Sequence, residues 1–129
     1  LIPALRRATR DMAIAVVLAH EYGHAIQELA TLIPKGVPTL VTEQQADCLA
    51  GVWGKRTDTM KSVLEPGDLE AALTAASAIG DDRLQQQSQG RIVPESFTHG
   101  SSDQRVRWFR KGFETGDMNQ CNTFKTDRL

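Results

Sequence analysis

The sequence lacks the features that mark nucleic-acid-binding and membrane-spanning proteins. Its 15 basic and 16 acidic residues cancel to a formal net charge of −1, and only seven of its 129 residues are aromatic. A chain without a basic excess, and with few aromatic side chains to stack on bases, is a poor candidate for binding nucleic acid. The longest apolar run, residues 12–19, is far shorter than the ~20 residues that cross a bilayer. We therefore expect neither a nucleic-acid partner nor membrane contact from this segment.

The chain also lacks an initiating methionine and a signal-peptide pattern at Leu1, so we expect it to be part of a longer protein. Its length is that of about one domain. We interpret residues 1–129 as one domain with an incomplete N-terminal part, to which an upstream membrane anchor could belong. Residues 117–129 show no hydrophobic periodicity and are expected to form an irregular tail.

Hydrophobic periodicity predicts a mainly α-helical fold. Apolar residues recur at helical spacing on two faces of residues 9–32, which indicates a buried helix that cannot continue far past Pro34. Thr42 begins a capping-box pattern, Thr-Glu-Gln-Gln, for a second helix from Glu43 to Gly54 or beyond. Further helices are expected over residues 68–80, over residues 81–89, and from the capping pattern at residues 101–104 to Gly116.

Strand signals are short and confined to residues 37–41 and 91–93. Asp81, Asp82 and Arg83 are interpreted as a solvated helix start rather than as a second metal site. The sequence therefore predicts a single, mainly α domain with at most a small strand component.

The strongest chemical signal is His20-Glu21-Tyr22-Gly23-His24, an H-E-x-x-H motif inside the first predicted helix. A spacing of four places both imidazoles on one helical face, so that both can bind one zinc ion at about 2.0–2.1 Å. Glu21 then lies beside the ion, where its carboxylate can take a proton from a water molecule that zinc activates and deliver it to a leaving amine. The motif therefore predicts hydrolysis by a zinc enzyme.

A catalytic zinc ion usually has three protein ligands, so a third residue is required. The extended metzincin pattern would place Gly at position 27 and His at position 30, but the chain has Gln27 and Ala30, which excludes that class. The two remaining candidates are Glu43 and His99. Glu43 is preferred because Asp47, one turn further along the same helical face, can accept the N–H of a zinc-binding imidazole.

Four segments together resemble a known family: HEYGHAIQ, TEQQADCLAGVW, GDLEAALTAASAIGDD and FTHGSSDQRVRWFRKGFETGD. The resemblance, which runs from about residue 12 to residue 124, is to the bacterial neutral zinc metallopeptidases, in the gluzincin group of zincin-like enzymes. It implies that His20, His24 and Glu43 bind zinc. It also implies that Glu21 is the general base and that Asp47 supports a zinc-binding histidine.

His99 and Arg105 also resemble part of another motif, the H-P-x-x-x-x-R element of CAAX prenyl protease-like peptidases, with Gly100 in place of the usual proline. A histidine in a cleft can donate a hydrogen bond to the oxyanion of the tetrahedral intermediate, and Arg105 can orient it or bind a carboxylate. The alternative is a surface histidine before a helix, with an arginine on the solvated side of that helix.

Cys48 and Cys121 are the only cysteines. A disulfide between them would tie the tail to the second predicted helix, with a loop-closure contribution of roughly 4 kcal/mol. Such a bond implies an extracytoplasmic location. We reject Cys48 as a zinc ligand because helical geometry points it about 100° away from Asp47.

The predicted function is zinc-dependent hydrolysis of a peptide or protein substrate, by endopeptidase rather than exopeptidase cleavage. The alternative is a non-catalytic zinc-binding module that keeps the peptidase fold as a binding or scaffold element. Gluzincin-like enzymes generally hold an extended substrate on the edge strand of a sheet that precedes the active-site helix. Residues 1–9 favour a helical turn over a strand, so the chain is expected to lack that sheet and to be a poor peptidase alone. Residues 37–41 or 91–93 are the alternative edge strand.

Overall fold

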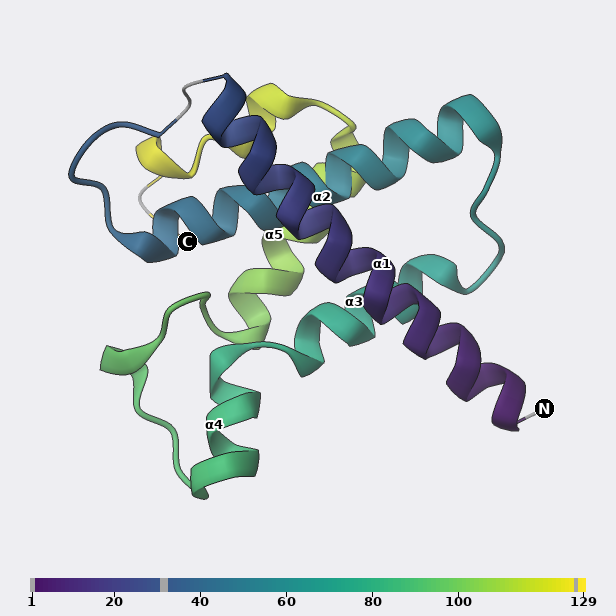
Figure 1. Cartoon of the computed structure of the whole chain (residues 1–129), viewed down its shortest axis with the longest axis horizontal. Helices are drawn as coiled ribbons and strands as arrows, with labels where there is room; N and C mark the ends of the chain where they lie inside the picture. The colour runs from purple at the N-terminus through teal and green to yellow at the C-terminus, as the bar shows by residue number, and fades with distance from the viewer. Residues whose placement is uncertain (1, 31–32, 127) are drawn as a thin grey trace.

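The computed structural model describes residues 2–30, 33–126 and 128–129 (Figure 1). Over these residues the chain forms an all-helical domain of five α-helices and three short 3-10 helices, with no strand. The elements are α1 (Ile2–Leu29), α2 (Thr39–Lys61), α3 (Asp68–Ala78), α4 (Asp81–Gln89), η1 (Pro94–Ser96), α5 (Ser102–Thr115), η2 (Met118–Cys121) and η3 (Thr123–Lys125).

Helix α2 is central, because α5 and α1 both pack against it, and α3 packs against α1 and α5 (Figure 1). None of the described helices combines the length and the apolar character that crossing a membrane requires. The mainly α prediction is thus confirmed over the part of the chain that the structure describes.

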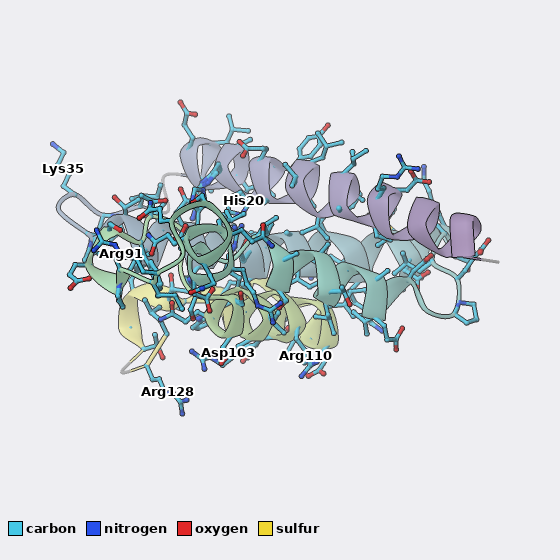
Figure 2. All side chains as sticks on the ribbon, turned by 90° about the horizontal axis from the view of Figure 1, so that it is seen from below. His20, Lys35, Arg91, Asp103, Arg110 and Arg128 are labelled. Atoms are coloured by element: carbon cyan, nitrogen blue, oxygen red, sulfur yellow. A yellow bond between two sulfur atoms is a disulfide. The ribbon has the colours of Figure 1, made fainter. Side chains whose placement is uncertain are left out.

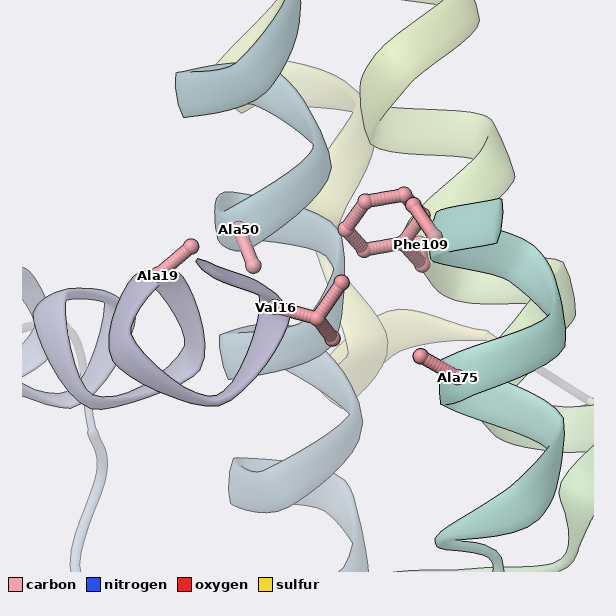
Figure 3. Packing of buried hydrophobic residues seen from close by; sticks show 6 residues of the cluster. Val16, Ala19, Ala50, Ala75 and Phe109 are labelled. Atoms are coloured by element: carbon pink, nitrogen blue, oxygen red, sulfur yellow. The ribbon is translucent and has the colours of Figure 1, made fainter. Parts of the chain in front are cut away.

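Two buried clusters form the core. The first joins α1, α2, α3 and α5 and is drawn in Figure 3, where Val16, Ala50 and Phe109 point toward one another. Its buried members are Val16, Ala19, Ala50, Ala72, Ala75 and Phe109. The second surrounds the disulfide and consists of Cys48, Leu49, Val52, Trp108 and Cys121. Alanines dominate the first cluster, so its helices approach one another closely.

Both long helices begin earlier than the sequence patterns predicted. Helix α1 begins at Ile2 rather than near Thr9, because Pro3 lies in the first turn, where its missing N–H is not needed. It ends at Leu29, and the predicted end at Leu32 lies outside the described residues.

The capping box predicted at Thr42 is wrong. Helix α2 begins at Thr39, after Pro38 at the N-cap, so Thr42 lies inside its first turn and has no capping role. The side chain of Gln45 bonds to Gln27 and Cys121 instead of reaching back to Thr42. A local pattern failed here because tertiary partners compete for the same side chain.

The two strand candidates are also wrong, since residues 39–41 belong to α2 and residues 91–93 form an irregular bend. The other helix predictions agree with the structure to within two residues at their ends. The capping box of Ser101 and Gln104 is present at the start of α5, which ends before Gly116 as predicted.

The tail is fixed to both α2 and α5. Cys48 and Cys121 form the predicted disulfide. The hydroxyl of Thr123 donates to the carbonyl of Val41 at 2.6 Å, and the indole N–H of Trp108 donates to the carbonyl of Leu129 at 2.9 Å. Within residues 117–126 the tail contains the two short 3-10 helices η2 and η3.

Candidate metal centre

Helices α1 and α2 bring three titratable side chains of the predicted site to one point. The Oε2 atom of Glu43 lies 2.9 Å from the Nε2 of His20 and 3.1 Å from the Nε2 of His24. The Nε2 of His99, from the loop before α5, lies 3.5 Å from the same oxygen. His20 is marked in Figure 2, where it lies between α1 and the rest of the molecule. The sequence left Glu43 and His99 as rival ligands, and the fold places both here.

The distances and the donor set fit a zinc ion. Bonds of about 2.0–2.1 Å in a tetrahedral site place neighbouring ligand atoms about 3.3 Å apart, close to the separations around Glu43. Ligand atoms of His20, Glu43 and His99 all lie within 4.8 Å of one another. His24 also turns its Nε2 toward Glu43. Imidazole nitrogen and carboxylate oxygen are ordinary zinc ligands.

A buried ion pair orients His20. Its Nδ1 lies 2.7 Å from the Oδ1 of Asp47, and since a carboxylate can only accept, Nδ1–H donates. Arg105 donates from Nε and Nη2 to the two oxygens of Asp47, both at 2.9 Å. Arg105 also donates to the carbonyl of Ile79 at 3.1 Å. Arg105 therefore contacts the carboxylate that faces His20.

These contacts shift the pKa values of Glu43 and of the two histidines that contact it. Burial by itself would lower the pKa of His20, but hydrogen bonds to Asp47 and Glu43 outweigh it and raise the pKa to about 9. The hydrogen bond to Glu43 raises the pKa of His24 against the effect of burial. Burial would raise the pKa of Glu43, but hydrogen bonds from His20 and His24 hold it well below its usual range. Without metal, these contacts favour the charged forms of Glu43 and of the two histidines.

Asp81 fixes the loop that carries His99. Its Oδ2 accepts from the backbone N–H groups of Thr98, His99 and Gly100 at 2.7–2.8 Å. The amide of Gln44 donates to the carbonyl of His99 at 2.7 Å, while the imidazole keeps 43% of its surface exposed. Asp81 is buried, so its interpretation as part of a solvated helix start is wrong.

Glu21 and Gly23 occupy different sides of α1. Glu21 is exposed, next to the buried His20. Gly23 faces α2, where a Cβ atom would lie 2.8 Å from the carbonyl oxygen of Ala46. The absence of a side chain at position 23 therefore lets α2 approach closely enough for Glu43 to reach both histidines.

The sequence patterns did not identify three buried residues that support the site. Gln27 bonds to His24, Gln45 bonds to Gln27, and Asp81 holds the loop of His99. Glutamines in a helical pattern are normally exposed, so the sequence carried no signal for a buried pair. The position of Asp81 directly after Gly80, at a helix start, was the one available signal.

An H-E-x-x-H helix whose histidines meet a carboxylate of a second helix is the arrangement found in the zincin class of metalloproteins. Residues 5–124 match the family described as "Putative neutral zinc metallopeptidase", and the chain belongs to this family.

Relatives of the chain occur in Escherichia coli and in Mycobacterium. A protein of Escherichia coli strain K12, named "Uncharacterized protein YpfJ", is 53% identical over 130 residues, covering 91% of this chain and 45% of its own length. "Uncharacterized protein Mb2605" of Mycobacterium bovis is 46% identical, covering 88% of this chain and 44% of its own length. The chain thus spans less than half the length of these curated relatives. No solved structure matches the chain significantly.

Proposed function

We propose that this chain is the zinc-binding catalytic part of a peptidase that hydrolyses peptide bonds in protein substrates. The observation that carries the proposal is the convergence of the Nε2 atoms of His20 and His24 on one oxygen of Glu43. Both Nδ1 atoms have acceptors, Asp47 and Gln27, so the Nε2 lone pairs of the neutral imidazoles are directed to a common point.

Each of these residues has a distinct role in the proposed reaction. His20, His24 and Glu43 would hold the ion. Zinc, when bound, supplies a Lewis acid that polarises a carbonyl and lowers the pKa of water to about 7. Glu21 accepts the proton of the attacking water and returns it to the leaving amine. Its exposed position beside His20 leaves its carboxylate accessible to solvent and substrate.

His99 would stabilise the transition state. Its imidazole is partly exposed at the edge of the centre, and Thr98 lies 2.9 Å from its Nδ1. From this position Nε2–H can donate to the oxyanion that forms when water attacks the scissile carbonyl. Arg105 would act through Asp47 and His20, as a positioning residue for the ion.

Cleavage within a chain, as an endopeptidase, is proposed in preference to cleavage at its ends. The disulfide between Cys48 and Cys121 supports an extracytoplasmic location, because such bonds persist in oxidising compartments.

The first test measures metal content and peptide hydrolysis together. We expect about one zinc ion per chain by elemental analysis, and loss of zinc in Glu43→Ala. Glu21→Gln should keep zinc and lose about 10²-fold or more in hydrolysis of an unstructured protein, because an amide cannot accept the proton of water. Glu28→Gln is the matched control, since Glu28 is an exposed acid on the same helix.

His99→Ala should keep zinc and lower the rate by about 10²-fold, as expected for loss of an oxyanion donor. Loss of zinc in this variant would instead make His99 a ligand. Retained hydrolysis in Glu21→Gln would remove the general base. If neither this chain nor a protein of the length of its relatives cleaves peptides when loaded with zinc, the result would favour the non-catalytic module.

A further inference from the structure

A buried row of side-chain amides connects the metal centre to the disulfide. The Nδ1 of His24 lies 2.8 Å from the Oε1 of Gln27. The Nε2 of Gln27 lies 2.9 Å from the Oε1 of Gln45. The Nε2 of Gln45 lies 3.0 Å from the carbonyl oxygen of Cys121, which is bonded to Cys48 on α2. The row therefore begins at a candidate zinc ligand and ends at a covalent anchor.

The backbone carbonyls of Thr42 and Cys121 fix which way the two side-chain amides face. The carbonyl of Cys121 can only accept, so the amide nitrogen of Gln45 must face it and the Oε1 of Gln45 faces Gln27. The Nε2 of Gln27 also donates to the carbonyl of Thr42 at 2.8 Å. The Oε1 of Gln27 is therefore the atom that faces His24, and the Nδ1–H of His24 donates to it.

Burial makes these orientations costly to change. Gln27 is fully buried and Gln45 is 6% exposed. Turning either amide would set a donor against a donor or an acceptor against an acceptor, and a buried amide left unpaired in this way destabilises the fold. A fully satisfied row of this kind holds its members in one arrangement.

We propose that Gln27 and Gln45 are positioning residues that transmit the anchorage of Cys121 to His24, so that the disulfide contributes to metal affinity. Donation from Nδ1 to Gln27 leaves Nε2 as the ring nitrogen of His24 that faces Glu43 and is available to bind a metal ion. The inference rests on the proposed function only in taking zinc as the metal. Catalysis plays no part in it.

Zinc affinity, measured by competition with a chromophoric chelator, is the first test. Gln27→Met keeps the volume of the side chain and removes its polar atoms, and we expect affinity to fall about 10- to 100-fold. The loss of zinc affinity in Gln45→Met should lie at the lower end of this range. Thr123→Val is the matched control, because it removes a buried tail-to-α2 hydrogen bond that lies outside the row, and it should change affinity less than twofold.

A double-mutant cycle tests the contribution of the disulfide. The Cys48→Ala/Cys121→Ala variant removes the covalent link between the tail and α2 without leaving thiols that bind zinc. We expect it to lose about as much zinc affinity as Gln45→Met. Adding Gln45→Met to that variant should cause no further loss, because both changes interrupt one row. Additive losses, or unchanged affinity in Gln45→Met, would overturn the proposal.

The metal-free protein gives a readout that a general loss of stability would not produce. An Nδ1 proton of His24 that is hydrogen-bonded to Gln27 should exchange slowly with water and therefore give a ring N–H resonance by NMR. This resonance should survive in Thr123→Val, shift in Gln45→Met and vanish in Gln27→Met. Its absence from the wild type would overturn the inference, whereas its presence in a chain that binds no zinc would contradict only the proposed metal site.

Discussion

At the scale of single residues, charge pairing at the metal centre decides how the chain responds to pH. His20 has a pKa raised to about 9 by its hydrogen bonds to Asp47 and Glu43, which outweigh burial. The unfolded chain keeps the ordinary value of about 6.5. A histidine with a raised pKa in the folded state stabilises that state fully below pH 6.5, and the stabilisation is lost as the pH rises through 9.

We predict that the free energy of unfolding of the metal-free chain falls by up to about 3 kcal/mol between pH 6.5 and pH 9. The lowered pKa of Glu43 acts in the opposite sense and removes stability as the pH falls below the usual range of a glutamate. Urea denaturation at several pH values would measure both limbs. With zinc bound, the loss toward pH 9 should disappear, since a ligand histidine carries no second proton. If the metal-free chain is equally stable at pH 6.5 and pH 9, the raised pKa of His20 is contradicted.

At the scale of elements, close contact between α2 and α5 determines where the second helix can present Glu43 and Asp47. A Cβ atom at Gly112 would overlap the carbonyl of Cys48, and one at Gly51 would overlap the carbonyl of Phe109. The two helices thus meet backbone to backbone, at glycines that tolerate the approach. Arg105 of α5 reaches Asp47 across this contact.

We predict that Gly112→Ala lowers the free energy of unfolding by about 2–3 kcal/mol, because an added methyl group must push the helices apart. Gly54→Ala is the control on α2. Its Cβ would lie 3.5 Å from the ring of Phe113, which is ordinary contact, so the higher helix propensity of alanine should leave stability equal or raise it by up to about 1 kcal/mol. Thermal denaturation compares the two variants. Equal stability would show that the helices can separate without cost.

At the scale of the whole molecule, a metal centre and a means of holding substrate are separate requirements. The described residues bring the candidate ligands together, yet they contain no strand along which an extended peptide could align. A peptide misplaced by ~1 Å relative to the reacting groups can lose ~10² in rate.

We therefore predict that the 129-residue chain binds zinc but cleaves unstructured protein at least about 10²-fold more slowly than a protein of the length of its relatives. The measurement compares the specific activity of both at equal zinc content, with Glu21→Gln of each as the blank. Equal activity would show that these helices hold the substrate unaided.

Four features could be predicted from the amino acids alone: the helical class, the candidate pairing of H-E-x-x-H with Glu43 and Asp47, the cap at Ser101 and the cysteine pair. The helical class, the cap and the histidine spacing depend on residues that are close in the sequence. Glu43 was joined to the motif by its neighbour Asp47 and by a family resemblance, and the disulfide was expected because there are only two cysteines. The roles of these residues in binding zinc and in hydrolysis stay predictions.

The partners of the buried polar groups became known only from the packing of the helices. Arg105 was expected to orient His99, to bind a carboxylate or to be solvated, and it binds the carboxylate of Asp47. Gln27 looked like a departure from another motif and instead supports His24. Asp81 looked solvated and instead binds the loop of His99. A buried polar group must find a hydrogen-bond partner, but which group it finds depends on how distant helices pack, and no local pattern records that.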